Sequence, residues 1–304
     1  MSLHVIVGSG EVGTTTAREL LAQGHRVRVV TRSGSGLEHP EVERVAADAT
    51  DAVRLSELAT GAAALYNCAN PPYHRWPQEW PPLATALLTA AERAGAVLVT
   101  MSNLYGYGPV DRPMTEDLPL TARTVKGRVR AQMWRDAYAA HAAGRIRATE
   151  ARASDFIGAG ARSLFNDMIA PAVLAGKVAT APVNFDVPHS VTFTGDVGRT
   201  MAVLGTDERA WGRAWHVPTA PATTMRDLAD RLAALAGAPS PRLRRMPGFV
   251  LRLGGLLQPT AREFMEMRYQ FERPFVLDSS AATATFGLKP TDLDDALRTM
   301  VARS

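Results

Sequence analysis

Cysteine and lysine are both scarce in this chain. Cys68 is the only cysteine in 304 residues, so no intramolecular disulfide can form and a cysteine-based zinc cluster is excluded. Its apolar surroundings predict a small core residue rather than a nucleophile. The only lysines are Lys126, Lys177 and Lys289, and arginine supplies almost all of the positive charge. This alanine- and arginine-rich usage is typical of a GC-rich bacterial genome, and no metal site is predicted.

Long apolar runs are also absent. No stretch approaches the ~18 residues of a membrane span, and the N-terminus has no basic region followed by an apolar one. We therefore expect a cytoplasmic protein without a membrane partner. The basic clusters around Arg128 and Arg244 are short, and apolar residues interrupt them. They lack the basic stripe and interleaved aromatics typical of a nucleic-acid surface, so no nucleic-acid partner is expected.

The first half of the chain alternates between strand patterns and helical patterns. Short apolar runs predict strands, and the amphipathic stretches between them predict helices. This repetition predicts an α/β fold, a doubly wound parallel sheet of the Rossmann type with right-handed crossovers. The expected strands are 4–7, 26–31, 43–46, 63–68, 97–101 and 147–151, and the expected helices are 11–23, 52–59, 82–94 and 127–143.

A glycine-rich turn joins the first strand pattern to the first helical pattern. Gly8, Gly10 and Gly13 have the G-x-G-x-x-G spacing of dinucleotide sites. The first glycine permits a sharp turn, the second lets the backbone approach the phosphates, and the third lets the helix pack on the strand. The N–H groups of the helix N-terminus would bind the pyrophosphate, beside Glu11 and Val12. A turn without a ligand is the alternative, and the flanking strand and helix make it the weaker one.

The second half of the chain has a different organisation. Beyond residue 155 the elements shorten and prolines become frequent. We expect residues 1–165, completed by 184–222, to form the dinucleotide-binding domain. Residues 166–183 and 223–304 should form a smaller, mostly helical substrate-covering region. Its expected helices are 225–236, 249–257, 261–269 and 292–301.

The end of the second strand pattern bears on the choice of dinucleotide. An NAD enzyme usually places an acidic residue there, whereas this chain has Arg32 followed by Ser33. Since a guanidinium pairs well with a 2′-phosphate, NADP is the first choice and NAD the alternative. Asp48, after the third strand, is expected either to accept from the adenine amino group or to cap the next helix. Asp51 competes for that capping position.

Further short motifs continue along nearly the whole chain. Together with the glycine turn and Asp48, they resemble the extended short-chain dehydrogenase/reductase superfamily, in particular its NAD(P)-dependent epimerase/dehydratase-like members. The resemblance implies that Ala69 and Asn70, at the end of the fourth strand, lie beside the cofactor. These motifs are residues 67–70, 102–106, 115–119, 194–197 and 286–291.

The catalytic residues of that family are altered here. The resemblance implies a serine after the fifth strand, here Ser102, and a Tyr-x-x-x-Lys pair one helical turn apart that transfers a proton and binds the ribose. At the aligned positions Lys126 replaces the tyrosine and Arg130 replaces the lysine. Arg130 keeps the charge and the donors for ribose. Lys126 has three interpretations: a general acid or base, an anchor for cofactor or an anionic substrate, or a surface lysine without a role.

Two phenols near Ser102 are candidates for the missing proton donor. Tyr105 and Tyr107 lie in a glycine-containing loop after the fifth strand. Either ring could reach the nicotinamide and transfer a proton, although packing is the alternative for Tyr105. Ser102 is the candidate for polarising a carbonyl oxygen.

Other residues are expected on the substrate side. Asp155 and His189 lie where relatives line the pocket, and the histidine could bind substrate, relay a proton or be structural. Trp76 and Trp80 belong to a proline-rich stretch after the fourth strand, predicted to be a lid or a rigid connection.

The sequence thus favours an NADP-binding oxidoreductase or epimerase-like enzyme acting on a small polar or sugar-like metabolite. Two alternatives stay open: a catalytically inactive dinucleotide-binding sensor or scaffold, and a non-redox isomerase or lyase that uses Lys126 as its base. The expected partner is a small-molecule substrate, and a homodimer is compatible with the sequence.

Overall fold

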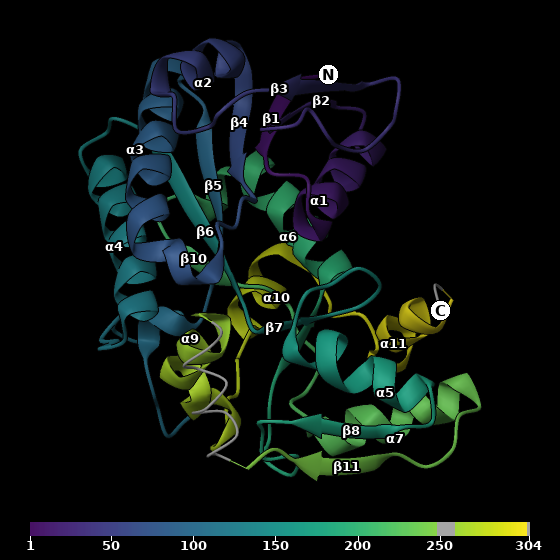
Figure 1. Cartoon of the computed structure of the whole chain (residues 1–304). Helices are drawn as coiled ribbons and strands as arrows, with labels where there is room; N and C mark the ends of the chain where they lie inside the picture. The colour runs from purple at the N-terminus through teal and green to yellow at the C-terminus, as the bar shows by residue number, and fades with distance from the viewer. Residues whose placement is uncertain (248–258, 303–304) are drawn as a thin grey trace.

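A parallel seven-stranded sheet forms the centre of the molecule (Figure 1). The structure is a computed structural model that describes residues 1–247 and 259–302. The strand order is β10-β6-β5-β4-β1-β2-β3. From β1 the chain first adds β2 and β3 on one side and then adds β4 and the later strands on the other, which confirms the doubly wound Rossmann topology. The strands are β1 (Leu3–Val7), β2 (Arg26–Thr31), β3 (Val42–Ala46), β4 (Ala62–Asn67), β5 (Val97–Asn103), β6 (Arg147–Ala153) and β10 (Ala214–His216).

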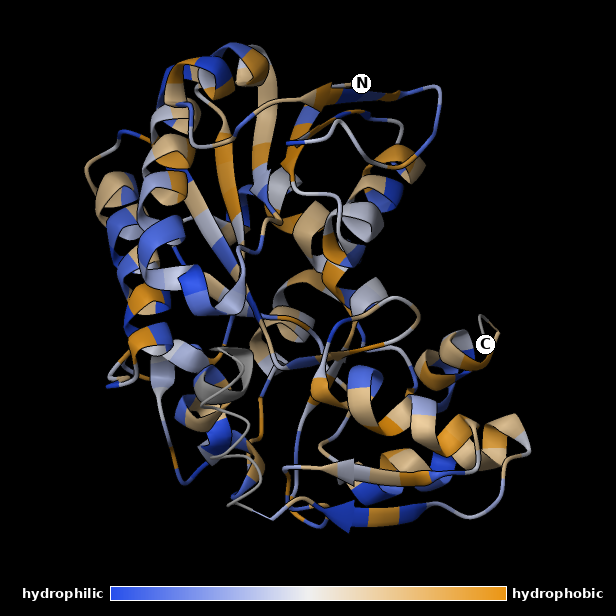
Figure 2. Ribbon diagram, in the orientation of Figure 1, coloured by the Kyte–Doolittle hydropathy of each residue, from blue (hydrophilic) through white to orange (hydrophobic). Residues whose placement is uncertain are grey.

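Helices cover both faces of this sheet, and each layer has its own apolar core. In Figure 2 the strands β1 and β5 are largely orange, because a parallel sheet covered on both sides needs apolar residues on both faces. One face carries α2 (Ala52–Ala59), α3 (Trp76–Ala94) and α4 (Val125–Ala142), and the other carries α1 (Glu11–Ala22) and α6 (Thr194–Thr206).

A smaller layer lies beyond the carboxyl ends of the strands (Figure 1). A third apolar core holds its helices against a two-stranded sheet. Its helices are α5 (Ala170–Leu174), α7 (Met225–Ala236) and α11 (Leu293–Val301), and its strands are β8 (Val178–Ala181) and β11 (Arg242–Arg245). The connecting elements are β7 (Asp155–Ile157), paired with β9 (Val191–Phe193), and the helices α9 (Pro259–Met267) and α10 (Ser280–Phe286).

Short helical turns connect these elements. They are η1 (Tyr73–Arg75), η2 (Tyr105–Tyr107), the π-helical turn η3 (Phe165–Ile169), η4 (Glu208–Ala210) and η5 (Arg268–Phe271). None of the helices in the described ranges is long and apolar enough to cross a membrane. The domain boundaries predicted from the sequence stay a prediction.

The prediction for the segment after β4 was wrong. It assigned Trp76 and Trp80 to a loop and began the helix at residue 82, whereas α3 begins at Trp76. Pro77 is compatible with this start because the first helical turn has no use for its missing N–H group. Both indoles are buried, so they form core rather than a lid. The predicted helix 249–257 lies outside the described residues, and α6 was not predicted.

Candidate active site

The glycine turn has the geometry that a bound pyrophosphate requires. Gly8 has φ +103°, and a Cβ on it would lie 2.8 Å from the backbone of Cys68. A Cβ on Gly13 would collide with the carbonyl oxygen of Gly8, so the helix packs directly on the turn. Gly10 faces open space, and no side chain caps the first turn of α1 there. These residues therefore fit a dinucleotide, whose phosphates would accept from the free N–H groups.

An open cleft of about 620 Å³ continues from this turn along the ends of β2 and β3; we call it the outer cleft. Arg32 and Ser33 line it, both exposed, together with Asp48. Asp51 caps α2 by accepting from Val53 N and Arg54 N, which leaves Asp48 free of that role. Hydrogen bonds from the backbone and hydroxyl of Thr50, with the charge of Arg32, hold the pKa of Asp48 below its usual range. Asp48 thus presents an ionised acceptor to the cleft.

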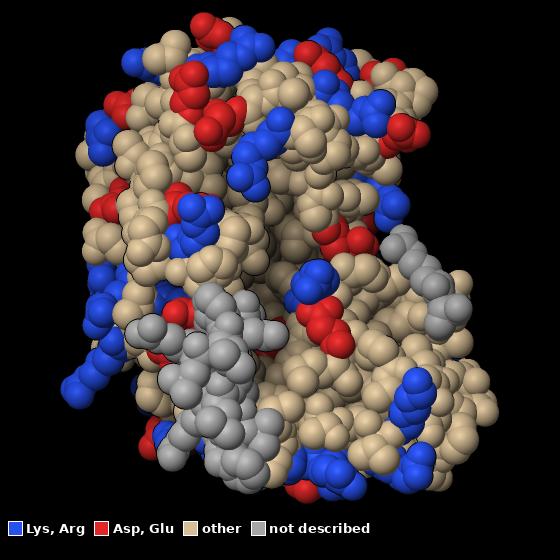
Figure 3. All heavy atoms as spheres, viewed as in Figure 1, with Lys and Arg blue, Asp and Glu red and all other residues tan. Residues whose placement is uncertain are grey.

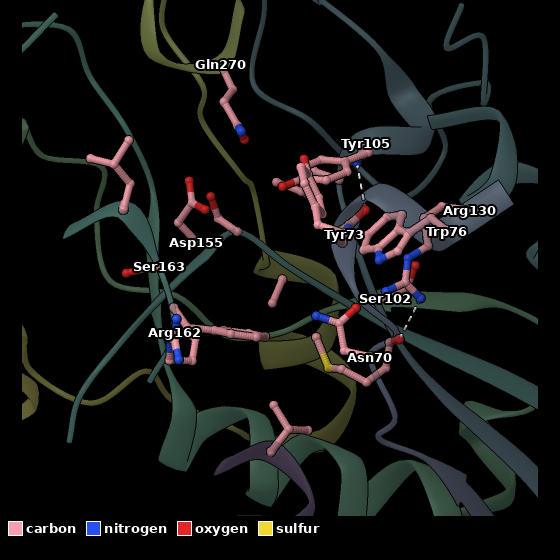
Figure 4. Close-up of a pocket in the computed structure, with 18 of the residues that line it drawn as sticks. Asn70, Tyr73, Trp76, Ser102, Tyr105, Arg130, Asp155, Arg162, Ser163 and Gln270 are labelled. Carbon is pink, nitrogen blue, oxygen red and sulfur yellow. Dashed lines mark hydrogen bonds between the residues drawn. The ribbon is translucent and has the colours of Figure 1, made fainter. Parts of the chain in front are cut away.

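A second space of about 390 Å³, the inner cavity, lies between the sheet and the smaller layer (Figure 4). It shares Cys68, Ala69 and Asn70 with the outer cleft. A dinucleotide extending from one to the other would pass these residues, as the predicted placement of Ala69 and Asn70 requires. Val12 and five other predicted site residues line the inner cavity: Trp76, Ser102, Tyr105, Arg130 and Asp155.

Polar side chains surround the hydroxyl of Tyr105 in the inner cavity. Tyr73 and Gln270 lie close enough to this hydroxyl to lower its pKa. Burial raises the pKa of Tyr105 to about 12, while those two partners and the charge of Arg130 oppose the shift. Burial raises the pKa of Tyr73 further, and Tyr105 adds to that rise. Both phenols are therefore neutral at pH 7, and Tyr105 is the more acidic of the two.

Arg130, predicted from the sequence to replace the family lysine, lines the same cavity. Its guanidinium lies between two indoles, 4.6 Å from the ring centre of Trp76 and 4.2 Å from that of Trp80. It donates to the carbonyl oxygen of Met101 at 3.3 Å. Burial lowers its pKa to about 10, and Glu150 is the main charge that opposes this. Nε is buried and has no hydrogen-bond partner among the described residues.

Ser102 lies beside Arg130 at the end of β5 and is almost fully buried. It lies near the carboxylate of Glu150, which accepts from Arg152 at 2.7 Å. Burial raises the pKa of Glu150, against the opposing charges of Arg152 and Arg130. Ser102 therefore lies at the wall of the cavity, beside a buried and charge-paired carboxyl group.

The geometry does not favour the predicted catalytic and cofactor-binding roles of Lys126. Its side chain is fully buried and is not among the residues that line the inner cavity. Nζ forms ion pairs with Glu263 and with Glu266, the latter at 3.1 Å. It also lies 4.5 Å from the centre of the Tyr73 ring. Lys126 thus joins α4 to α9, and the sequence prediction missed this because its partners lie far along the chain.

Tyr107 is also committed to structure rather than to substrate. Its hydroxyl accepts from Arg152 at 2.7 Å and lies 2.7 Å from Nε2 of His216. The other ring nitrogen of His216 donates to the carbonyl oxygen of Asp278, and burial lowers the pKa of this histidine. In the neutral ring Nε2 is the acceptor, so Tyr107 donates to it. Its proton is engaged, and the ring is buried and not among those that line the inner cavity, so the geometry does not favour the predicted substrate contact.

His189 reaches the cavity only through Asp155. Its ring is 1% exposed and is stacked against Phe271 and Phe275 at 5.1 and 5.3 Å. Nδ1 donates to the carbonyl oxygen of Gln270, and Nε2 lies 2.7 Å from Oδ2 of Asp155. The histidine therefore orients Asp155, which itself lines the cavity. Sequence reasoning missed Gln270 and the role of Tyr73, because no local pattern marks either residue.

A family model described as the NAD dependent epimerase/dehydratase family matches residues 5–185. The chain belongs to this family. The match includes the glycine turn, the strand ends that form the inner cavity, and the altered pair Lys126 and Arg130. Membership and the fit of the turn together support a nicotinamide dinucleotide site. A comparison with curated protein sequences gives no significant match.

Solved structures of epimerases and dehydratases have the same fold. One is dTDP-glucose 4,6-dehydratase from Bacillus anthracis in complex with NAD, with TM-score 0.80, 14% identity and coverage of 99% of this chain and 96% of that one. Another is UDP-glucose 4-epimerase from Thermotoga maritima with UDP-glucose, with TM-score 0.79, 15% identity and coverage of 99% and 97%. A third, DesIV from Streptomyces venezuelae, has TM-score 0.76, 19% identity and coverage of 99% and 96%.

Proposed function

We propose that this family member is an NADP-dependent oxidoreductase that reduces the carbonyl group of a small polar molecule, with Tyr105 as the proton donor. The observation that carries the proposal is that Tyr105 lines the inner cavity together with Gln270 and Arg130, whose side chains both favour the ionised form of its hydroxyl. A phenol and a cation thus line one cavity, as the tyrosine and lysine of the family pair would. Here the phenol would come from η2 instead of α4.

The protonation state of Tyr105 favours reduction over oxidation. The bound dinucleotide supplies the hydride to the carbonyl carbon. Tyr105 gives its proton to the carbonyl oxygen, Ser102 donates a hydrogen bond to the same oxygen, and the product is an alcohol. With a pKa of about 12 the phenol holds its proton at neutral pH, so it is ready to donate and poorly suited to act as a base.

The preference for NADP rests on the end of β2. Arg32 and Ser33 line the outer cleft where the adenosine ribose would lie. An arginine can pair with both oxygens of a 2′-phosphate, whereas no carboxylate follows β2 directly to accept from a free 2′-hydroxyl.

A second candidate function is a dinucleotide-binding protein without catalysis. The observation that favours it is Lys126, because the family's tyrosine position is filled by a side chain sealed from the cavity. The same contacts argue against an isomerase or lyase with Lys126 as its base, since a substrate in the inner cavity does not reach Nζ.

The variant Tyr105→Phe tests the proposed function. Loss of the donated proton should lower kcat by about 10²- to 10⁴-fold in a spectrophotometric assay of NADPH oxidation with a panel of carbonyl compounds. The Kd for NADPH should stay the same, because Tyr105 contacts the substrate side. Tyr138→Phe, on the exposed surface of α4, is the matched control. Unchanged kcat in Tyr105→Phe would show that another group donates the proton. Normal NADPH binding without turnover of any compound would favour the non-catalytic function.

The variant Arg32→Ala tests the choice of dinucleotide. Removing charge-assisted hydrogen bonds to the 2′-phosphate should raise the Kd for NADPH roughly 10- to 100-fold and leave that for NADH unchanged, as measured by calorimetry. Arg18→Ala, on the exposed side of α1, should change neither value. Equal weakening of NADPH and NADH in Arg32→Ala would contradict a 2′-phosphate contact.

A further inference from the structure

Resting on the proposed function, we infer that the inner cavity takes a compact substrate without a phosphate group, which presents a hydroxyl or amino group as hydrogen-bond donor to Asp155 and Gln270. The nucleotide sugars bound by some structural neighbours do not suit this cavity. Four features of the described side chains lead to this inference: the balance of cations, a capped helix end, unpaired acceptors and aromatic walls.

The two arginine side chains that line the cavity already interact with other groups of the protein. Arg162 forms an ion pair with Asp167 at 3.0 Å, and its side chain is 86% exposed. Arg130 lies between two indoles and interacts with the charge of Glu150. No other lysine or arginine lines the cavity in the part of the chain that the structure describes. In Figure 3 the hollow is mostly tan, with charged side chains mainly at its edges. A diphosphate would lose water here without gaining a cation in return.

The helix end nearest the cavity does not replace those cations. The turn η3 begins beside Ser163 and Leu164, which line the cavity. Asn166 N donates to the hydroxyl of Ser163 at 3.2 Å, and Asp167 N donates to its carbonyl oxygen at 2.9 Å. The carboxylate of Asp167 adds negative charge to this first turn. The donors and the dipole that would attract a phosphate are thus already used.

Acceptors, in contrast, are left without partners in the cavity wall. Oε1 of Gln270 is buried, in a residue only 3% exposed, and has no hydrogen-bond partner in the described structure. Asp155 uses Oδ2 for His189, and its other oxygen has no recorded hydrogen bond within residues 1–247 and 259–302. A buried acceptor without a partner is unfavourable, so a ligand that donates to it should bind more tightly than a matched ligand that does not. Figure 4 shows Asp155 and Gln270 on the side of the cavity where Tyr73 and Tyr105 also lie.

The aromatic lining and the volume of the inner cavity indicate the shape and size of the rest of the substrate. Phe156, Phe264, Phe271 and Phe275 line the cavity opposite the sheet end. Their surfaces suit an apolar body or the C–H face of a ring. The volume of about 390 Å³ is near the lower end of the ~300–1,000 Å³ usual for ligand sites, and the nicotinamide ring would occupy part of it. The remaining space suits one ring rather than a sugar joined to a nucleotide.

Calorimetry in the presence of saturating NADP, together with the NADPH oxidation assay, tests this inference. Two classes of probe are compared. The first is the nucleotide sugars UDP-glucose and dTDP-glucose. The second is matched pairs of small ketones with and without a hydroxyl group, such as 2-hydroxyacetophenone and acetophenone. The variant Asp155→Asn keeps the size of the side chain and removes its charge. Asp186→Asn, at an exposed residue paired with Arg226, is the control.

A hydroxylated compound should have a Kd at least 10-fold lower than that of its matched analogue. Asp155→Asn should reduce this preference at least 10-fold, and the control variant should retain it. Micromolar binding of either nucleotide sugar would overturn the inference, as would a preference that Asp155→Asn leaves intact or no binding of either class. The proposed function fails separately, when a compound binds beside NADPH and no NADPH is consumed.

Discussion

The guanidinium of Arg130 lies between two indoles, and these rings would orient it toward a ribose if it takes the predicted role of the family lysine. Trp76 and Trp80 hold its plane, so the charge is fixed in direction although it is buried. A lysine would present a single point charge, which these rings would orient less well. Arg130 and the aromatic start of α3 therefore form one structural unit beside Tyr105 in the inner cavity.

The buried His4 makes the free energy of unfolding depend on pH. Burial, followed by the nearby His25, lowers the pKa of His4 from 6.5 to about 4. Between these two values the unfolded chain takes up a proton that the folded chain does not, so the free energy of unfolding falls as the pH falls from 6.5 toward 4. The loss should be roughly 2–3 kcal/mol, measured by urea unfolding at several pH values. His4→Gln should flatten this slope, and exposed His74→Gln should not. An unchanged acid slope in His4→Gln would show that carboxylates alone control it.

The element that matters most for the site is α9, which docks on the start of α4. Glu266 accepts from both Val125 N and Lys126 Nζ, and Glu263 accepts from the same ammonium. The helix also brings Phe264 to the inner cavity. The buried lysine therefore acts on the site through the position of α9, and not through proton transfer.

The variant Lys126→Met should loosen α9. Without the ammonium, two half-buried carboxylates face each other, and local opening should become easier by roughly 1–3 kcal/mol. Amide hydrogen exchange across Pro259–Met267 should then be about 5- to 150-fold faster, with exchange in β1 and β4 unchanged. Lys177→Met, at an exposed lysine before β8, is the control. Unchanged exchange in α9 would mean that its apolar contacts alone hold it.

Elements were predictable where the signal is local. The boundaries of β2, α2 and α7 agree with their apolar periods, and Gly237 ends α7 in the left-handed conformation as such glycines do. The prolines near the start of α3 did not predict where this helix begins. Pro77 lies in the first turn, where proline is tolerated. Pro81 and Pro82 lie within the helix, and the burial of Trp76 and Trp80 outweighs their cost.

For the whole molecule, the two halves of the candidate site differed in how far the sequence could predict them. The outer cleft is built around one contiguous turn whose glycines have a fixed spacing, so it could be predicted. The inner cavity combines Tyr73, Tyr105, Asp155 and Gln270, which only the fold brings together. Their chemistry depends on burial and on partners across the chain, and neither has a local signature.

The glycine turn allows cofactor binding and folding to be separated in the intact protein. Gly10 has φ −66°, and nothing lies within 4 Å of the position that a Cβ would take there, so Gly10→Ala should fold with a Tm within about 2 °C of the original. That methyl would occupy the path of the phosphates, and the rise in Tm caused by NADPH, about 2.7 kcal/mol of stabilisation at 100 times Kd, should disappear. Gly13→Ala should instead lower the Tm without ligand, because its methyl meets the carbonyl of Gly8 at a cost of roughly 1–3 kcal/mol. If Gly10→Ala kept the full NADPH shift, the phosphates would not lie against this turn, and the dinucleotide site would have to be sought elsewhere along the sheet edge.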